Sequence, residues 1–278
     1  MAQEKLDWAM PVMRAGYAGR GVTYVVIAGL SLWTIWRGGD AQGTGEALRS
    51  IETSTFGTIL LVIIGVGLLC YTAWRVLDGF LDLEDEGDDL KGMIARAGMV
   101  VTGMVHAAIG VAAIGIVFGS GGGSGGQGGS SIASATQEVM SAPFGIWLVG
   151  IAGVLTIGAG IYYLAKAYKQ SYRKKLRANE FTTNWNSALR AGVLAQGIVV
   201  GIIGGFLVYA AWTANPQEAG GLGQAFEWLS QQVYGQVLVT ALCLGLLGFA
   251  VFLFVNAAYR IVPRLSDPDV ENLAHAMR

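Results

Sequence analysis

The sequence predicts an all-α polytopic membrane protein with six transmembrane helices, and its composition and charge distribution are the two observations that predict it. Hydrophobic residues make up 53% of the chain and charged residues 13%, whereas a water-soluble domain carries about 25% charged residues. Several long segments contain no Asp, Glu, Lys or Arg: 53–74, 97–137, 191–217 and 228–259. A helix needs about 20 apolar residues to cross the hydrocarbon core of a bilayer, so each of these segments can span a membrane.

Six spans are predicted along the chain, and all of them are expected to be helices. Inside hydrocarbon the backbone must form its own hydrogen bonds, and apolar runs of this length without period-two alternation do so as helices rather than barrel strands. The first span lacks the small-residue cleavage site of a secretory signal, so we expect it to stay in the mature protein. The predicted spans are Gly16–Trp36, Phe56–Leu77, Ala97–Val117, Phe144–Ala165, Ala191–Thr213 and Tyr234–Tyr259.

Each odd-numbered span opens on a variant of one motif, and each even-numbered span opens on an aromatic residue followed by glycine. The motif is RAGYAGRG at 14–21, RAGMVVTG at 96–103 and RAGVLAQG at 190–197. A unit of two helices returns the chain to its starting side, so three such units share one orientation about an axis along the membrane normal. The sequence therefore predicts a single membrane domain over 1–278, with three parallel-oriented two-helix repeats in a pseudo-threefold arrangement. The predicted repeats are 12–83, 94–170 and 188–262.

A short polar segment precedes each even-numbered span. In the third repeat Phe226, Leu229 and Val233 have helical spacing, which is typical of a short helix lying in the membrane interface. In the second repeat the segment includes GSGGGSGGQGGSS at 119–131. This run lacks the Lys-Ser or Lys-Thr ending of a phosphate-binding loop, so we predict a flexible glycine-rich outer linker.

Lys and Arg residues are concentrated on one side of this topology. Of the 18 in the chain, only Arg37 and Arg49 fall on the side that holds the glycine-rich linker. Short loops rich in Lys and Arg stay in the cytoplasm. Both termini are therefore expected to be cytoplasmic.

The motif combines an arginine with glycines, and we expect the two residue types to act differently. The arginines mark where odd-numbered helices leave the headgroup region, where a cation can contact anionic lipid. The glycines allow close helix packing, which in lipid depends on small residues because hydrophobic burial drives no association there. The predicted headgroup contacts are Arg14, Arg96 and Arg190, together with the basic run Arg173, Lys174 and Lys175. The predicted packing positions are Gly21, Gly29, Gly103, Gly197, Gly201 and Gly205.

The triple Arg-Ala-Gly opening, the aromatic–glycine start of each partner helix and GLLCYTAWRVLDGF at 67–80 together resemble a known pattern. They are similar to the bacterial membrane family catalogued as domain of unknown function 1206, and the resemblance covers roughly Val12 to Val262. It implies six helices in three repeats in a bacterial cytoplasmic membrane. It implies no reaction, ligand or catalytic residue.

His106 is the sharpest single candidate for a functional residue. It lies ten residues beyond Arg96 and therefore about 15 Å into the membrane. One interpretation is a neutral histidine that is hydrogen-bonded to a neighbouring helix, and the other is a proton or ligand site, since ionisable groups at this depth are functional candidates. Its repeat equivalents are Tyr24 and Val200, so no ring of matching ligands is expected.

Asp78, Lys166 and Asn256 each follow the glycine that opens an even-numbered span by the same number of residues. Under pseudo-threefold symmetry they would lie at one depth near the cytoplasmic face. Asp78 and Lys166 could then pair, and Asn256 could complete a polar cluster that serves as a gate or an anion contact. The plainer interpretation is three unrelated interface residues, because charges are tolerated at helix ends.

The sequence contains no nucleophile–base pair, cofactor fingerprint, paired buried carboxylates or metal-ligand cluster. We therefore expect no enzymatic activity, cofactor, metal or nucleic-acid partner. The preferred function is a compact helix bundle that interacts with membrane lipids, including anionic headgroups at the cytoplasmic face, or with another membrane protein. The alternative is a small-solute or ion transporter or channel that is proton-coupled through His106. The first should have a dry, glycine-packed centre, whereas the second needs a water-accessible cavity that reaches His106.

Overall fold

The computed structural model describes residues 8–52, 55–119, 128–265 and 271–277. The described residues form helices and no strands, and six of the helices are long and apolar enough to cross a membrane. The predicted all-α membrane fold is thereby confirmed. The six are α1 (Ala9–Trp36), α3 (Thr55–Leu81), α4 (Leu90–Val117), α6 (Gly145–Lys169), α8 (Asn186–Thr213) and α10 (Gly235–Tyr259).

Shorter helices lie in the connections between the spanning helices. One of them precedes the second spanning helix of each repeat: α2 precedes α3, α5 precedes α6 and α9 precedes α10. One of them corrects the predicted linker, because α5 begins at Gly128, inside the run 119–131, while 120–127 lie outside the described residues. The short helix expected in the third repeat is present as α9 and begins somewhat earlier than its apolar spacing indicates. The short elements are α2 (Thr44–Ser50), α5 (Gly128–Ser141), η2 (Ser171–Lys175), α7 (Glu180–Asn184), η3 (Pro216–Glu218), α9 (Leu222–Ser230) and α11 (Leu273–Ala276).

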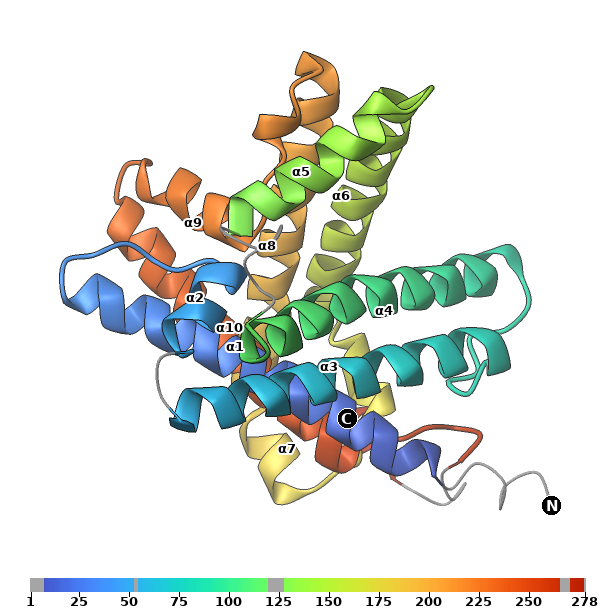
Figure 1. Ribbon diagram of the computed structural model, residues 1–278. Helices are drawn as coiled ribbons and strands as arrows, with labels where there is room; N and C mark the ends of the chain where they lie inside the picture. The colour runs from blue at the N-terminus through green and yellow to red at the C-terminus, as the bar shows by residue number, and fades with distance from the viewer. Residues whose placement is uncertain (1–7, 53–54, 120–127, 266–270, 278) are drawn as a thin grey trace.

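The spanning helices pack in an open series rather than a closed ring. α4 packs on α3, α3 on α1, α1 on α10, α10 on α8 and α8 on α6. A complete threefold arrangement of hairpins would also pair α4 with α6, but these two helices make at most a marginal contact. Figure 1 shows them diverging from each other. The predicted pseudo-threefold ring requires six contacts between neighbouring spanning helices. Five of these contacts are formed, and the contact between α4 and α6 is not.

Small residues explain why the first and third hairpins close. In the first repeat, a Cβ atom added at Gly19 would lie 2.5 Å from the Cα atom of Gly67, so the backbones of α1 and α3 touch. At the aligned positions of the third repeat, a Cβ atom added at Gly245 would lie 2.5 Å from the Cβ atom of Ala195. In lipid, such close backbone approach is what holds helices together.

The second hairpin has large residues at the same two positions. Val101 aligns with Gly19 on the odd helix, and Leu155 aligns with Gly67 on the even helix. Their side chains are 55% and 67% exposed. Because α4 and α6 lack the pair of small residues that lets two backbones meet, this hairpin stays open.

The glycines of the RAG motif contact two different helices. The third motif residue faces the even helix of its own repeat: Gly16 lies against Tyr71 and Gly192 against Phe249, whereas nothing lies within 4 Å of a Cβ atom added at Gly98. The last motif residue faces the even helix of the adjacent repeat in the series. Gly21 lies against Phe254, Gly103 against Arg75 and Gly197 against Leu164. The glycines of the motif thus allow the first spanning helix of a repeat to pack between two second spanning helices, one from its own repeat and one from the adjacent repeat.

Three of the six predicted packing glycines do not pack as expected. The space beside Gly29, Gly201 and Gly205 is open, although the backbone of Gly201 is touched by Gly160. Gly204 takes the place predicted for Gly205, since a Cβ atom there would lie 2.6 Å from the backbone nitrogen of Ile157. Two turns of helix contain about 7.2 residues, so the residue seven positions after Gly197 lies closer to its face than the residue eight positions after it.

We expect Gly16→Ala and Gly98→Ala to differ sharply, although they change the same motif position. The added methyl group at residue 16 would lie 2.5 Å from the Cα atom of Tyr71, whereas the one at residue 98 would meet open space. Overpacking of this kind costs about 1–3 kcal/mol, so Gly16→Ala should lower the thermal unfolding midpoint in detergent micelles. Gly98→Ala is the matched control and should leave the midpoint unchanged or raise it. Equal losses in the two variants would contradict the assigned packing.

Candidate functional site: a charged core

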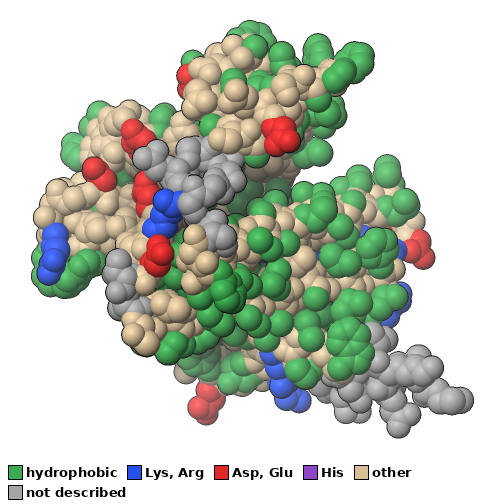
Figure 2. Space-filling view, in the orientation of Figure 1, with side chains coloured by type: hydrophobic (Ala, Val, Ile, Leu, Met, Phe, Trp, Pro, Cys, Tyr) green, Lys and Arg blue, Asp and Glu red, His purple; other side chains and the backbone are tan. Residues whose placement is uncertain are grey.

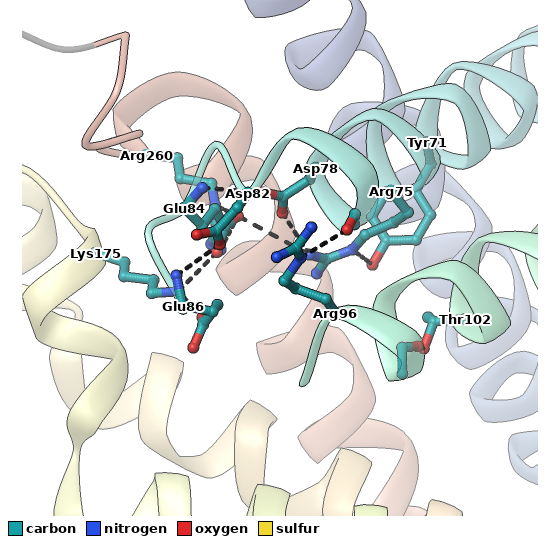
Figure 3. Close-up of polar contacts among 12 residues, drawn as sticks. Tyr71, Arg75, Asp78, Asp82, Glu84, Glu86, Arg96, Thr102, Lys175 and Arg260 are labelled. Atoms are coloured by element: carbon teal, nitrogen blue, oxygen red, sulfur yellow. Dashed lines mark hydrogen bonds and ion pairs between the residues drawn. The ribbon is translucent and has the colours of Figure 1, made fainter. Parts of the chain in front are cut away.

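A cluster of buried and half-buried charged side chains lies at the end of the bundle where α1 begins and where α3 and α10 end. We call it the charged core and define it by its members. They are Arg20, Arg75, Asp78, Glu84, Lys175 and Arg260. Figure 3 shows most of this cluster, with side chains from α3, from the loop 82–89, from η2 and from the end of α10 directed toward one another.

The loop that follows α3 is folded by its own acidic residues. The Oδ1 atom of Asp78 accepts a hydrogen bond from the backbone nitrogen of Glu84 at 3.0 Å. The carboxylate of Asp82 accepts from the backbone nitrogens of Glu86 at 2.8 Å and Gly87 at 3.2 Å. These bonds turn the loop back on the helix end and direct the side chain of Glu84 into the bundle.

Glu84 is the centre of the charged core and joins three segments of the chain. Its residue is 3% exposed. Its carboxylate accepts hydrogen bonds from Arg260 Nε at 2.8 Å and Nη2 at 2.5 Å, and from Lys175 Nζ at 2.8 Å. Arg75 Nη1 lies 3.9 Å away. A buried carboxylate with this many cationic donors satisfies the requirement that buried charges be paired and hydrogen-bonded.

The three cations keep Glu84 ionised. Burial alone would raise the pKa of the Glu84 carboxyl, but the charges of Arg260, Lys175 and Arg75 outweigh it and hold that pKa well below its ordinary value. Burial would likewise lower the pKa of Lys175, yet the carboxylate of Glu84 raises it above its ordinary value. Glu84 and Lys175 therefore both remain charged at neutral pH.

Arg20 lies deeper in the bundle and has a different environment. It is 4% exposed, and among the described residues it has no carboxylate within ion-pair distance. Its Nη1 atom donates to the hydroxyl oxygen of Tyr71 at 2.9 Å, and that oxygen also accepts from Arg75 Nε. Its guanidinium lies 5.0 Å from the ring centroid of Tyr71 and 5.4 Å from that of Phe249. Its Nε atom has no hydrogen-bond partner among the described residues. Aromatic faces therefore supply much of its stabilisation.

The predicted cluster of Asp78, Lys166 and Asn256 is not formed as expected. Asp78 lies 3.6 Å from Arg75, one turn earlier on the same helix, and Asn256 accepts from Arg260 and donates to the carbonyl of Phe252. No carboxylate lies within ion-pair distance of Lys166 among the described residues. The predicted Asp78–Lys166 ion pair is therefore not formed among the described residues. Asp78 instead lies near Arg75 and accepts a hydrogen bond from the backbone of the loop.

His106 and Tyr24 contribute to the aromatic surroundings of the charged core. His106 Nδ1 lies 2.7 Å from the carbonyl oxygen of Thr102, so its hydrogen bond is to its own helix and not to a neighbouring one as the plainer interpretation expected. Its ring lies 4.9 Å from that of Tyr71, and the ring of Tyr24 lies 5.0 Å from that of Phe249.

Two pockets of about 550 and 980 Å³ lie at the opposite end of the bundle, around α9. Neither is lined by His106 or Arg20. Their lining includes the acidic residues Asp40, Glu46, Glu218 and Glu227.

The predicted headgroup contacts divide into two sets. Arg14, Lys174 and Arg190 are exposed. Three other members of the set are instead held by the protein: Arg96 donates to the carbonyl oxygens of Gly79 and Phe80 and pairs with Asp88, Arg173 donates to Asn186, and Lys175 pairs with Glu84 and Glu86.

Sequence reasoning did not single out Arg20 and Arg75, although they lie inside the predicted spans Gly16–Trp36 and Phe56–Leu77. A signal was available for both: each lies within a predicted helical stretch, and an ionisable residue inside a span is a functional candidate by default. The inward position of Glu84 had no comparable signal, since the acidic run 84–89 has the composition of a solvated loop.

Comparison with known proteins finds the same threefold repetition. The family described as Domain of Unknown Function (DUF1206) matches residues 15–82, 97–170 and 191–260. The chain is 29% identical over 262 residues to an uncharacterized protein, YxxB, of Bacillus subtilis, and the match covers 93% of this chain and 94% of that protein. No solved structure matches.

We expect Glu84→Gln to destabilise the protein strongly. The substitution would leave Arg260 and Lys175 buried or half-buried without their shared counter-charge, and breaking a buried pair costs about 3–5 kcal/mol. Asp85→Asn is the control, because Asp85 is an exposed neighbour that, among the described residues, forms an ion pair only with Arg264, at 3.7 Å. Thermal unfolding in detergent should show a large loss for the first variant and almost none for the second, and the reverse order would refute the central role of Glu84.

The depressed pKa of Glu84 also predicts acid sensitivity. Because its pKa is lower in the folded than in the unfolded protein, its stabilising contribution is fully present above the unfolded value of about 4.3 and is lost as the pH falls through the folded value. The unfolding midpoint should therefore decrease below about pH 4.3. Glu84→Gln should show a shallower decrease over the same range. Parallel curves for the two proteins would show that other groups cause the acid sensitivity.

Proposed function

The chain belongs to the DUF1206 family of proteins with membrane-like helices, and we propose that it is a non-enzymatic integral protein of a bacterial cytoplasmic membrane whose helix bundle holds membrane lipid between α4 and α6. The observation that carries this proposal is the single unclosed helix pair of the bundle. We call the space between α4 and α6 the wedge.

The residues that face the wedge are identified by their register. Val101 and Leu155 occupy the positions at which the helices of the other two hairpins touch and are largely exposed, so we assign them to the two sides of the opening. Gly98 and Gly158 have nothing within 4 Å of an added Cβ atom. Figure 2 shows a notch between the surface formed by α6 and that formed by α3 and α4, with hydrophobic side chains on both sides. Acyl chains are the natural occupants of such an apolar opening within a bilayer.

Charge distribution supports cytoplasmic termini. The end of the bundle that holds the charged core also holds the exposed cations Arg14, Lys174 and Arg190, while the pockets at the opposite end are lined by acidic side chains. Basic residues near helix ends favour the cytoplasmic side. The exposed cations are then at the level of anionic headgroups.

The same geometry favours a lipid-holding bundle over a proton-coupled transporter. The helices α1 and α3 meet at two glycines, α8 and α10 meet at glycine and alanine, and the charge of Glu84 is compensated within the protein. His106 is engaged with Thr102 and Tyr71 and lines neither of the two pockets.

We expect a photoreactive benzoylphenylalanine at position 155 to capture lipid that survives delipidation. Leu155 faces the wedge, whereas Val66 on α3 is 51% exposed and faces away from the bundle, so the same probe at position 66 serves as the control for loosely bound lipid. After purification in detergent, mass spectrometry should find lipid adducts at position 155 and few at position 66.

Three outcomes would overturn the proposal. An adduct from position 155 to α4 would mean that the wedge is closed, and a cross-linked dimer would mean that a second copy fills it. Proton or ion flux in liposomes that is abolished by His106→Phe would favour the transporter.

A further inference from the structure

The charged core and its surroundings hold more positive than negative charge. Its carboxylates, Asp78 and Glu84, and the neighbouring Glu86 are engaged with Arg75, Lys175 and Arg260. Two further cations, Arg20 and Lys166, have no carboxylate within ion-pair distance among the described residues. Excess charge at the edge of a low-dielectric region is stabilised by a counter-ion.

Lys166 is the more accessible of these two cations. It is half-buried near the end of α6, one turn before Lys169. Its Nζ atom lies 5.9 Å from the ring centroids of Tyr162, Tyr163 and Phe252. Ring faces stabilise the ammonium group, but they leave its hydrogen-bonding capacity unused.

The repeat shows that Lys166 differs from its two equivalents. Asp78 in the first repeat receives a backbone hydrogen bond from Glu84, and Asn256 in the third repeat is bonded to Arg260. Within the described part of the chain, Lys166 has neither a hydrogen bond nor an ion pair. It lies on α6, which is one of the two helices that border the wedge.

One aromatic group connects Lys166 with Arg20. The ring of Phe249 lies 5.7 Å from that of Phe252 and 6.4 Å from that of Tyr163. Arg20 lies over Phe249, and Lys166 lies over the other two rings. Both cations therefore lie against one aromatic group, which is formed by side chains of α6 and α10.

We propose that Lys166 binds the phosphate of an anionic phospholipid whose acyl chains lie in the wedge, with Arg20 adding to the positive potential from behind the aromatic group. This inference rests on the proposed function and adds the headgroup class to it. The wedge supplies apolar surface for the chains, and Lys166 supplies a donor at the level where a phosphate would lie. A free phosphate offers the same anion without chains, so the two sources can be separated by experiment.

The test uses nanodiscs that contain equal amounts of phosphatidylglycerol and phosphatidylcholine. After extraction in mild detergent, the lipid that stays with the protein is quantified by mass spectrometry. We expect phosphatidylglycerol to be enriched about fivefold, which is the factor expected for one basic residue near anionic lipid. Lys166→Met should remove the enrichment, because methionine fits among the aromatic rings without the charge, and Lys166→Arg should retain it.

Lys169→Met is the matched control, because Lys169 is an exposed lysine one turn away on the same helix. It should leave the enrichment intact, and an equal loss in both methionine variants would replace the site with general surface attraction. Unchanged enrichment in Lys166→Met would overturn the headgroup site. Displacement of the bound lipid by excess inorganic phosphate would show that the site takes a free anion, and would also overturn it.

The failure of this inference is distinguishable from the failure of the proposed function. If the benzoylphenylalanine at position 155 captures lipid but neither lipid class is enriched, the wedge holds lipid and Lys166 does not select it. If that probe captures no lipid in the otherwise unaltered protein, the proposed function itself fails. A thermal unfolding curve for each variant ensures that only folded protein is compared.

Discussion

Helices in a bilayer associate only where their backbones can come close, and this constraint determines the architecture of the protein. Lipid chains are as apolar as leucine side chains, so burial of apolar surface does not draw two helices together. At the crossing of α1 and α3 the contact is glycine against glycine, and at the crossing of α8 and α10 it is glycine against alanine. Where the second repeat has Val101 and Leu155, the same pair of helices is separated. The two closed hairpins thus have small residues at this crossing, and the open hairpin has two large ones.

The charged core depends on this packing and in turn connects parts of the chain that the helices alone would not join. Glu84 is placed by hydrogen bonds within its own loop, but its counter-charges come from η2 and from the end of α10. Removing such groups from water is costly unless they are paired, so the positions of three segments are fixed together. Arg20 follows another rule: its charge is met by a hydroxyl and by aromatic faces. The interior therefore stabilises some cations by ion pairs with carboxylates and Arg20 by a tyrosine hydroxyl and aromatic rings.

The number, type and order of the spanning helices could be predicted from the sequence because hydrocarbon permits few backbone conformations. The charge-free segments located the helices, and the Arg-Ala-Gly motif located the repeats. The motif glycines Gly21, Gly103 and Gly197 contact neighbouring helices. Gly29 and Gly205 do not, because a strict spacing of four drifts around a helix that has 3.6 residues per turn.

The candidate site was less predictable, since its residues are defined by partners that are distant in sequence. Arg20 and Arg75 lie inside predicted spans but were not singled out, because charges near helix ends usually face water or headgroups. Only the tyrosine hydroxyl and the aromatic rings explain how they are accommodated. The open second hairpin did leave a trace in the sequence, in the bulky residues aligned with Gly19 and Gly67. These bulky residues can be interpreted only when the structure shows where the helices of the other two hairpins cross.

The partners Glu84 and Arg260 are 176 residues apart in the chain, which has a consequence for biosynthesis. A ribosome that adds about 5–20 residues per second needs roughly 10–35 s to make that intervening segment. Throughout this interval the nascent first hairpin carries an acidic side chain whose main counter-charge has not yet been translated. That side chain must stay hydrated at the membrane surface until the final helix has been inserted, so tertiary assembly at this end can be completed only after nearly the whole polypeptide has been synthesised.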